Sequence, residues 1–490
     1  MAHALAGKPV QEQDIIDVQT IVDAYFDNVP DMTNPTQLVS FGTSGHRGTS
    51  VDGTFTDLHV AAITQAICDG RKQFGATGPI FVGQDTHALS QPALVTVLEV
   101  LAGNGVTAMV DCDMAFVPTP SVSRAIIRYN EEHDDKADGI IITPSHNPPD
   151  NGGIKYNTII GGPADTVVTK WIEMRANEYL TAYCESEDFK RISIDNIEPS
   201  AQVPYDYKGL YVEELGDVIN MEAIKAAGPK VLVDTLGGSG ASYWNAIKER
   251  YGLDLTIIHD DYDPTFSFMT YDHDGKVRMD CSSTYVMASV INRIGDFDLA
   301  VGNDPDYDRY GIVVSSGLIS ANTFLTLAAR YLFTTRGWKN KGVGKTVVCT
   351  TMIDKWAADA ETPVYEVPVG FKYFSQLLFD GAIGIGGEES AGASFLKKDG
   401  TVWTTDKDGM IMALLSMEIM AVMGKSALKM TDEFVEEFGN PSFGRIDAPC
   451  KKEQKQILKQ MSAELITATT VDGDPITNIR TTSLYNDMPI

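Results

Sequence analysis

The chain has 490 residues, with 39 Lys and Arg against 67 Asp and Glu, and a formal net charge of -28 at pH 7. At about 150 residues per domain, this length predicts roughly three or four domains, each with a buried core. So acidic a surface lacks the cationic field that nucleic acid or an anionic membrane requires, which excludes both as partners. An anionic substrate would have to enter a locally positive site.

The cysteines indicate a reducing, cytoplasmic location, because they are scattered without a C-x-x-C pair that would suggest a zinc ribbon. They are Cys68, Cys112, Cys184, Cys281, Cys349 and Cys450. We expect no membrane span, since no apolar run approaches the roughly 18 residues needed. We also expect no signal peptide, because the N-terminal residues lack a basic region followed by an apolar stretch. A monomer and a homodimer are both compatible with the sequence.

Helices and strands alternate along the chain. The first predicted elements are a helix at 15–25, a helix from 57 capped by Thr56, a strand at 79–82, a helix at 90–101, a strand at 106–110, a helix at 121–129 and a strand at 139–143. After an irregular stretch come strands at 230–234, 253–258, 297–301 and 310–314, a helix at 324–333, strands at 346–349 and 364–367, and helices at 372–379 and 409–423. This order predicts an α/β protein of three successive units with largely parallel sheets covered by helices on both faces.

The first candidate loop is Thr143-Pro144-Ser145-His146-Asn147-Pro148, which follows a predicted apolar strand. In parallel α/β sheets, ligands bind outside the carboxyl ends of the strands, so the hydroxyl of Ser145 is well placed to react. A serine hydroxyl is a weak nucleophile, and it needs a base, a metal or a prior covalent modification. An ordinary polar turn is the alternative interpretation.

The second candidate loop, Asp304-Pro305-Asp306-Tyr307-Asp308-Arg309, lies between two predicted apolar strands. In an extended loop, residues two apart point the same way, so the three aspartates can converge on one cation. Three oxygen ligands in a tight loop favour Mg²⁺. A calcium loop is excluded, because Arg309 stands where that loop needs glycine and Ser315 where it needs glutamate. A solvated acidic turn is the alternative.

The third candidate loop, residues 386–392, follows a strand-like segment at 382–385. The carboxylates and the hydroxyl of this loop, including Glu388 and Ser390, are suited to hydrogen-bond the vicinal hydroxyls of a sugar. The loop lacks the G-x-G-x-x-G spacing of a nucleotide-binding turn, as does the glycine-rich turn at 237–240. A plain glycine turn is the alternative.

A fourth segment, residues 41–48, combines small residues with a cation. Small residues such as Thr43 and Ser44 let backbone N–H groups approach an anion, and Arg47 can add a fixed positive charge. Other cations near the candidate loops in the sequence are Lys155, Arg278, Lys372 and Lys398. They are a weaker signal, because single Lys and Arg residues are usually solvated.

Together and in this order, these segments resemble the α-D-phosphohexomutase superfamily, most closely its bacterial phosphoglucomutases. The resemblance rests on TPSHNP, DPDYDR and GEESAG, and it runs from about Leu38 to the last residue. It implies three related α/β domains with mixed, largely parallel sheets around a central cleft, and a smaller fourth domain. The corresponding segments are an N-terminal extension at 1–38, domains at 39–205, 206–318 and 319–432, and the start of an incomplete fourth domain at 433–490.

The resemblance also implies a role for each matching residue. Ser145 would bear a phosphoryl group, and Asp304, Asp306 and Asp308 would hold Mg²⁺ together with an oxygen of phosphorylated Ser145. Charge stabilisation and proton transfer would involve Arg47, His146 and Lys155. Substrate binding would involve Thr43, Ser44, Arg278, Arg309, Lys372, Glu388, Ser390 and Lys398. The implied reaction converts glucose 1-phosphate to glucose 6-phosphate, with glucose 1,6-bisphosphate as intermediate and activator.

One departure from the family concerns the phosphate that does not react. The fourth domain of the family carries an Arg-x-Ser-Gly-Thr-Glu loop for this distal phosphate, and no such sequence occurs here, although residues 473–477 match the entry into that domain. Either the chain is truncated relative to complete family members, which is the alternative that we expect, or the protein works without this loop. Losing one or two charge-assisted phosphate contacts predicts turnover lowered about 10- to 1000-fold or more.

Other functions stay open at this stage. A non-catalytic, sugar-phosphate-binding or regulatory remnant would keep the motifs without turnover. A mutase for another phosphohexose, such as mannose or glucosamine phosphate, would keep the chemistry, although Glu388-Glu389-Ser390 favours glucose. A serine phosphatase fits least well, because nothing in the sequence marks a two-metal site that activates water.

Overall fold

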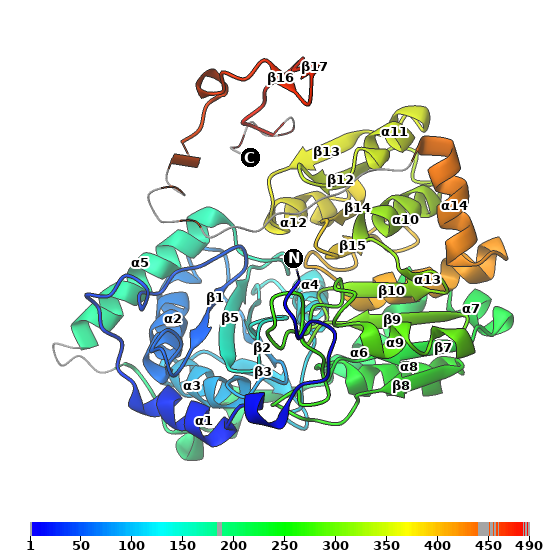
Figure 1. The fold of residues 1–490 in the computed structure, drawn as a ribbon. Coiled ribbons are helices and arrows are strands. Elements are labelled where there is room, and N and C mark those ends of the chain that lie inside the picture. The colour runs from blue at the N-terminus through cyan, green and yellow to red at the C-terminus, as the bar shows by residue number, and fades with distance from the viewer. Residues whose placement is uncertain are drawn as a thin grey trace.

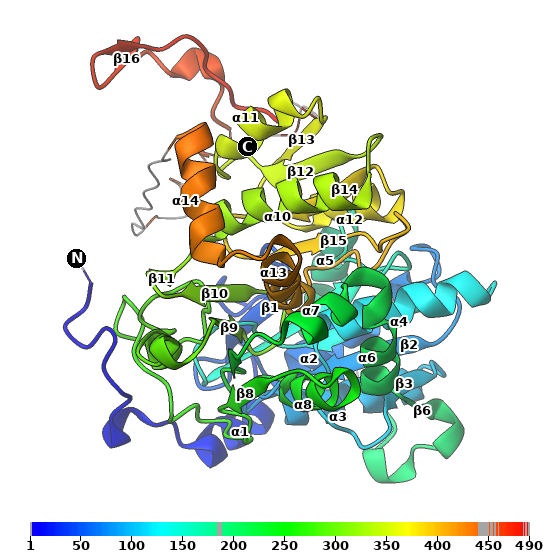
Figure 2. The same cartoon turned by 90° about the vertical axis from the view of Figure 1, so that its right-hand side faces the viewer.

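The computed structural model describes residues 2–183, 189–439, 450, 454, 457–458, 460–483, 485 and 488. Three sheets, each covered by helices, lie around the middle of the molecule, and a C-terminal hairpin segment lies apart from them (Figure 1). The third sheet lies above the second when the molecule is seen from the side (Figure 2). Cys184 and much of the predicted segment 433–490 fall outside the described residues.

The first sheet has the strand order β1-β5-β4-β2-β3-β6. These strands are β1 (His46–Thr49), β2 (Ile80–Gln84), β3 (Ala108–Asp111), β4 (Asp138–Ile142), β5 (Asn151–Asn157) and β6 (Gln202–Tyr205). Strands β4, β2, β3 and β6 are parallel neighbours, whereas β5 is antiparallel to both β4 and β1. Ile80 and Val82 point into one core and Phe81 into another, as alternation along a strand requires.

Helices cover both faces of this first sheet. They are α1 (Val18–Asp27), α2 (Asp57–Gly70), α3 (Ser90–Gly103), α4 (Thr119–Glu132) and α5 (Thr166–Tyr183). Helices α1, α2, α3 and α5 share one hydrophobic core, and α4 contributes to the core on the other face. The arrangement confirms the predicted α/β layering.

The second sheet has the order β11-β10-β9-β7-β8. Its strands are β7 (Val231–Asp234), β8 (Leu255–Ile258), β9 (Leu299–Asn303), β10 (Tyr310–Val314) and β11 (Gly317–Leu318). Its helices are α6 (Tyr207–Val218), α7 (Met221–Ala227), α8 (Ala241–Tyr251) and α9 (Ala288–Ile291). Strands β9, β7 and β8 run parallel, and β10 returns antiparallel to β9.

The third sheet has the order β13-β12-β14-β15. Its strands are β12 (Gly342–Thr346), β13 (Val364–Val367), β14 (Ile383–Gly387) and β15 (Ala393–Phe395). The helices of this region are α10 (Ala321–Arg336), α11 (Met352–Asp359), α12 (Lys372–Phe379), α13 (Gly409–Met423) and α14 (Ala427–Phe438). Here too the central strands are parallel, and the last strand, β15, is antiparallel to β14.

Shorter elements complete the described chain. They are the 3-10 helices η1 (Glu12–Asp14), η2 (Ile194–Asn196), η3 (Pro199–Ala201), η4 (Ile294–Asp296) and η5 (Ala463–Leu465), and the strands β16 (Thr470–Val471) and β17 (Asp474–Pro475). The two strands pair with each other as an antiparallel hairpin.

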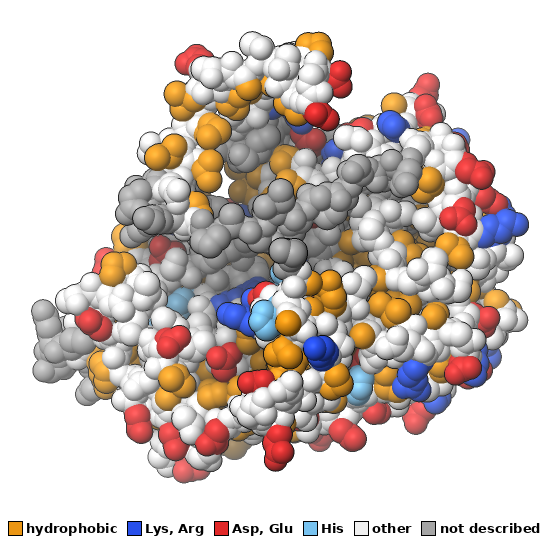
Figure 3. All heavy atoms as spheres, viewed as in Figure 1, with side chains coloured by type: hydrophobic (Ala, Val, Ile, Leu, Met, Phe, Trp, Pro, Cys, Tyr) orange, Lys and Arg blue, Asp and Glu red, His pale blue; other side chains and the backbone are white. Residues whose placement is uncertain are grey.

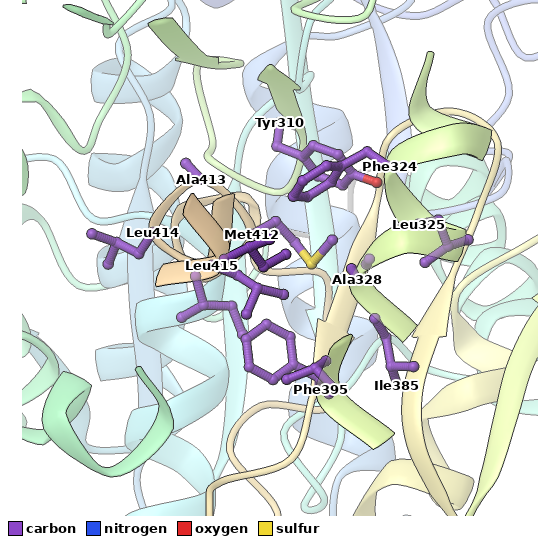
Figure 4. Close-up of a cluster of buried hydrophobic side chains, with 14 of the residues drawn as sticks. Tyr310, Phe324, Leu325, Ala328, Ile385, Phe395, Met412, Ala413, Leu414 and Leu415 are labelled. Atoms are coloured by element: carbon purple, nitrogen blue, oxygen red, sulfur yellow. The ribbon is translucent and has the colours of Figure 1, made fainter. Parts of the chain in front are cut away.

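Helix α13 lies in a core that the second and third sheets share. Its sequence is apolar on all sides, which is typical of a fully buried helix, and Asp408 caps its start by accepting a hydrogen bond from the N–H of Ile411 at 3.1 Å. Met412 and Leu415 of α13 pack among side chains of β10, α10 and β15 (Figure 4). Among the described residues, no single helix is long and apolar enough to cross a membrane; only the bent pair formed by α13 and α14 meets that test, by length and composition.

The N-terminal residues form a strap across the second sheet's loops. Residues 3–10 exchange backbone hydrogen bonds with residues 269–273, including the N–H of Gly7 to the carbonyl of Tyr271 and the N–H of Tyr271 to the carbonyl of Lys8. The Tyr271 hydroxyl donates to Asp14 at 2.6 Å. The chain then continues to α1 at the base of the first sheet (Figure 1). The strap therefore ties the first sheet's helices to a long loop of the second.

Most predicted elements are present, with boundaries shifted by a few residues. The predicted strand at 346–349 is wrong: β12 ends at Thr346, and Cys349 lies in a turn that precedes α11. The sequence patterns did not predict β1 and β5, because both strands are rich in glycine and polar residues. These two antiparallel strands turn out to carry Arg47 and Lys155.

Candidate active site

Each sheet presents one of the three candidate loops at an equivalent position. In each case a parallel strand ends, the loop follows, and the next strand returns antiparallel beside it. The connections run from β4 to β5, from β9 to β10 and from β14 to β15. The carboxyl ends of parallel strands are where α/β sheets bind ligands. The three motifs therefore occupy one topological site repeated three times.

Ser145 is held in a left-handed backbone conformation, with φ of 60°. In a residue other than glycine, such a conformation costs about 1–3 kcal/mol of free energy. The Ser145 N–H donates to the hydroxyl of Thr143 at 2.7 Å, and the Ser145 hydroxyl donates to Asp304 Oδ2 at 2.8 Å. His146 Nδ1 lies 3.4 Å from the same hydroxyl. The loop thus presents Ser145 directly to the acidic loop of the second sheet.

Asp304, Asp306 and Asp308 form a fully buried acidic cluster. One carboxylate oxygen of each lies within 4.8 Å of those of the other two. The Oδ1 atoms of Asp306 and Asp308 are buried and accept no hydrogen bond from the protein. Buried anionic oxygens without donors are costly unless a cation binds them. These residues therefore fit a divalent metal such as Mg²⁺, which prefers carboxylate oxygens.

Two lysines from other sheets neutralise part of this cluster. Lys155 Nζ lies 2.5 Å from Asp306 Oδ2 and 3.2 Å from Asp308 Oδ2, and Lys407 Nζ lies 2.6 Å from Asp308 Oδ2. Burial alone would lower the pKa of Lys155, but Asp306 and Asp308 outweigh burial and raise it. Lys155 therefore stays protonated beside the carboxylates.

The cluster divides its charge unevenly among the aspartates. Burial, together with Asp306 and Asp308, raises the pKa of Asp304 well above its usual range. Burial also opposes ionisation of Asp308, but the cations Lys407 and Lys155 outweigh it and lower the pKa of Asp308. Without a metal, Asp304 thus holds a proton more readily than Asp308 does.

Two arginines lie against the same cluster. Arg309 donates its backbone N–H to Asp304 at 2.9 Å, and its buried Nε has no hydrogen-bond partner. Arg47 donates to the Ser44 hydroxyl at 3.1 Å, and burial lowers the pKa of Arg47 although the nearby aspartates oppose this. Both guanidinium groups therefore keep donors available for an anion.

His146 faces a further carboxylate, Asp280, at 4.0 Å. Burial, and then the charge of Arg309, lowers the pKa of His146 to about 3, so its imidazole is neutral near pH 7. Burial works against ionisation of Asp280, yet His146 and Arg309 lower its pKa to about 2. Arg278 lies two residues away and bonds Asp274 at 2.9 Å instead of entering the cluster.

The third loop meets the second through a backbone bridge between Arg309 and Gly392. Glu388 is 5% exposed and accepts the N–H of Gly370 at 3.0 Å. Burial is the main cause that raises the pKa of Glu388. Ser390 is half-buried. This loop therefore adds a carboxyl and a hydroxyl at the edge of the acidic cluster.

The remaining predicted residues are more widely spread. A Cβ built on Gly370, in the third sheet's region, would lie 3.5 Å from Thr43, so the 41–48 segment approaches that region. Lys372 donates to Thr166 at 2.8 Å and links α12 to α5. Lys398 donates to the carbonyl of Gly216 at 2.6 Å, at the end of α6. The structure therefore does not bring Lys398 together with the three loops.

Three further residues of the site were not predicted from the sequence: Lys407, Asp280 and Thr119. Thr119 donates to Asp306 at 2.8 Å from the start of α4. Lys407 had a usable signal, because a cation between two aspartates directly before the most apolar helix of the chain is unusual. Asp280 and Thr119 had no comparable signal, since only the tertiary fold brings them to the loops.

The surface agrees with a locally positive centre in an acidic protein. Acidic side chains are scattered over the visible face, and some Lys, Arg and His side chains lie in the hollow at its middle, while other Lys and Arg side chains lie on its right-hand part (Figure 3). Opposite charge at the mouth of such a hollow attracts an anionic ligand. A protein with a net charge of -28 can thus still admit a phosphorylated molecule.

Comparison with known proteins adds independent findings. Models of phosphoglucomutase/phosphomannomutase alpha/beta/alpha domains I, II and III match residues 38–182, 210–317 and 320–438. A phosphoglucomutase of Komagataeibacter xylinus is 46% identical over 490 residues, which cover 99% of this chain and 88% of that protein. Phosphoglucomutase 1 of Saccharomyces cerevisiae is 28% identical, over 85% of this chain and 76% of its own.

Solved structures share the fold at lower identity. Parafusin, a phosphoglucomutase of Paramecium in an open form, superposes with a TM-score of 0.67 at 20% identity, over 84% of this chain and 76% of that one. A phosphoglucomutase/phosphomannomutase family protein of Burkholderia thailandensis gives a TM-score of 0.63 at 20% identity, over 80% of both chains. These structures have the same three-sheet architecture.

Proposed function

The chain belongs to the phosphoglucomutase/phosphomannomutase family, and from that premise we propose that it interconverts glucose 1-phosphate and glucose 6-phosphate through a phosphoryl group on Ser145. As a phosphoglucomutase, it is an isomerase of sugar phosphates. The observation that carries the role of Ser145 is its hydrogen bond to Asp304, which joins the Ser145 hydroxyl to a buried acidic cluster.

In the proposed reaction, phosphorylated Ser145 gives its phosphoryl group to O6 of glucose 1-phosphate. The bond between phosphorus and Ser145 Oγ breaks as the bond to O6 forms, and the proton of the sugar hydroxyl is released. The resulting glucose 1,6-bisphosphate turns over and returns its 1-phosphoryl group to Ser145, which leaves glucose 6-phosphate. The bisphosphate is also the activator, because it rephosphorylates a serine that has lost its group.

Phosphoryl transfer depends mainly on positioning and on neutralising the oxygens of the group in flight. Mg²⁺ held by Asp304, Asp306, Asp308 and an oxygen of phosphorylated Ser145 would supply that neutralisation. Lys155 pairs with Asp306 and Asp308 and helps to keep Asp308 ionised, and Arg309 has an unused Nε donor for a phosphoryl oxygen. The burial of these groups excludes water, which competes with the sugar as acceptor.

Other residues would hold the sugar and steady the charge. We assign Glu388 and Ser390 to the sugar hydroxyls, because both stand where the third loop meets the second. Arg47 and His146 would stabilise charge or carry protons beside Ser145. Thr43, Ser44, Lys372 and Arg278 would contribute to binding phosphate or sugar from the surrounding segments. The proposed location of the protein is the cytoplasm.

The test is turnover of glucose 1-phosphate by the purified chain with Mg²⁺ and catalytic glucose 1,6-bisphosphate. We expect formation of glucose 6-phosphate, loss of activity with EDTA and its return with excess Mg²⁺. Ser145→Ala is expected to abolish turnover, whereas Ser193→Ala, at a distant 3-10 helix, leaves it unchanged. Peptide mapping after incubation with the bisphosphate should find the phosphoryl group on Ser145. A phosphate-free Ser145 would contradict the proposal and favour a binding remnant.

A mutase for another hexose is the second candidate, because the matching domain models cover both phosphoglucomutases and phosphomannomutases. Measuring kcat/KM for mannose 1-phosphate and glucosamine 1-phosphate against glucose 1-phosphate decides between them. A higher value for either would overturn the assignment to glucose. The same assay, run beside the Komagataeibacter relative, measures whether turnover is lowered.

A further inference from the structure

A buried histidine and aspartate lie beneath the loop of Ser145, outside every motif discussed so far. Asp85 directly follows β2, and His87 lies three positions before the first residue of α3. Both are 1% exposed. His87 Nδ1 lies 2.8 Å from Asp85 Oδ2 and His87 Nε2 lies 3.1 Å from the carbonyl oxygen of Asn147.

This pair contacts both sides of Ser145. Asp85 Oδ2 accepts the Thr143 hydroxyl at 2.6 Å, and the Thr143 oxygen in turn accepts the N–H of Ser145 at 2.7 Å. On the other side, His87 reaches the backbone of Asn147. Residues two before and two after Ser145 are therefore fixed to one buried ion pair.

The hydrogen bonds define the protonation state of the histidine. A carboxylate and a carbonyl oxygen only accept hydrogen bonds, so both ring nitrogens of His87 must carry protons. Burial alone would lower the pKa of His87, but the charge of Asp85 outweighs burial and raises it. The centre of the His87 ring also lies 5.1 Å from the ring centre of Phe266, a fully buried residue in a long loop of the second sheet's region.

We propose that His87 is a positioning residue that, with Asp85, holds Ser145 in its left-handed conformation and aims its hydroxyl at Asp304. The proposal rests on the role of Ser145 given under Proposed function. An ion pair suits the task, because an ionised Asp85 has only acceptors, so the Thr143 hydroxyl must donate to it and keep its oxygen turned to the N–H of Ser145. Without the charge of His87, the buried Asp85 would take up a proton and the Thr143 hydroxyl would lose its fixed direction.

The experiment compares His87→Phe with a matched variant, His59→Phe. His59 is also a buried histidine with hydrogen bonds to Thr56 and to the carbonyl of Gln37, but it has no link to Ser145. We expect kcat of His87→Phe to fall about 100-fold with KM within about threefold, because misplacing a reacting atom by about 1 Å costs about that factor. His59→Phe is expected to lose stability while its folded fraction keeps a kcat within twofold.

A second readout is the single-turnover rate at which glucose 1,6-bisphosphate phosphorylates Ser145. We expect it to fall with kcat in His87→Phe, and to recover about tenfold when Asp85→Asn is added, since the amide needs no counter-charge and still accepts from Thr143. His87→Gln keeps one donor and serves if the phenylalanine variant does not fold, with an expected tenfold loss. Equal rates for His87→Phe and His59→Phe would overturn the positioning role alone. A wild-type Ser145 that accepts no phosphoryl group would overturn the proposed function instead.

Discussion

Among the described residues, two clusters of metal-ligating side chains could hold a metal by proximity, and they differ in almost every other respect. Asp304, Asp306 and Asp308 are buried, whereas in the cluster of Asp272, His273 and Asp274 only Asp272 is buried. In the buried cluster two oxygens have no protein donor. In the exposed cluster, Asp274 is bound by Arg278 and Asp272 by the Ser283 hydroxyl.

The difference shows that the number of carboxylates does not define a metal site. Exposed carboxylates are satisfied by water and by neighbouring donors, and they gain little from a cation. Buried carboxylates that retain unpartnered oxygens cost free energy until a cation arrives. Burial of the acidic loop between three sheets is therefore what makes it a candidate metal centre.

The largest effect is expected from Asp306→Asn in the buried cluster. The substitution keeps the shape of the side chain but removes one of three anionic ligands, so we expect Mg²⁺ binding to weaken strongly and kcat to fall about 1000-fold. Steady-state kinetics across a Mg²⁺ titration measures both effects. Activity within tenfold of wild type at saturating Mg²⁺ would show that Asp306 is not a ligand.

A smaller effect is expected from Lys407→Met. Lys407 lies 2.6 Å from Asp308, and losing a charge-assisted contact of about 1.5–3 kcal/mol predicts a 10- to 100-fold drop in kcat/KM. Lys425→Met is the control, because Lys425 pairs with Glu433 on the exposed side of α14 at 2.7 Å. A change of similar size in both variants would point to a general charge effect.

The pH dependence of metal binding should also separate the two clusters. The pKa of Asp304 is raised, so below that pKa Asp304 binds a proton that Mg²⁺ must displace. Affinity for Mg²⁺ should then fall about tenfold per pH unit below that pKa and become level above it. Calorimetry in two buffers of different ionisation enthalpy counts the protons released. The pKa of Asp274 is lowered, since Arg278 bonds it despite partial burial, so no proton release is expected there.

The smallest expected effect is that of Asp274→Asn in the exposed cluster. The substitution removes the negative charge that pairs with Arg278, and a surface ion pair contributes only about 0–1 kcal/mol to stability. We expect kcat, KM and the Mg²⁺ requirement to stay within twofold of wild type. A tenfold change in the Mg²⁺ requirement would mean that both clusters bind metal, and would remove the contrast between them.

The sequence predicted those parts of the candidate site whose residues lie together on one short segment of the chain. Ser145 and the three aspartates follow apolar strands, so their place at a carboxyl edge could be inferred from chain order. Lys155 and Arg47 were weak candidates from the sequence and gained a role only through the resemblance, because β5 and β1 have no alternating apolar pattern. Contacts such as Lys407 with Asp308 join residues about a hundred positions apart and become visible only in the folded chain.

Lys398 shows how far sequence proximity can differ from proximity in the folded chain. It follows the glycine-rich third loop by a few residues, yet the antiparallel return of β15 carries it away to the end of α6. The predicted domain boundaries remain predictions. The structure shows only that α13 belongs to a core shared by two sheets.

The N-terminal strap has a consequence for the order in which the chain folds. Its hydrogen bonds to Tyr271 join residues 257 and 260 positions apart. A ribosome adds about 5–20 residues per second, so Tyr271 is synthesised on the order of 13 to 50 s after the strap residues that bond it. During that interval the first sheet can complete its core while the strap waits unpaired. The loop that carries Asp280 toward His146 thus gains part of its hydrogen bonding from residues about 260 positions earlier in the chain.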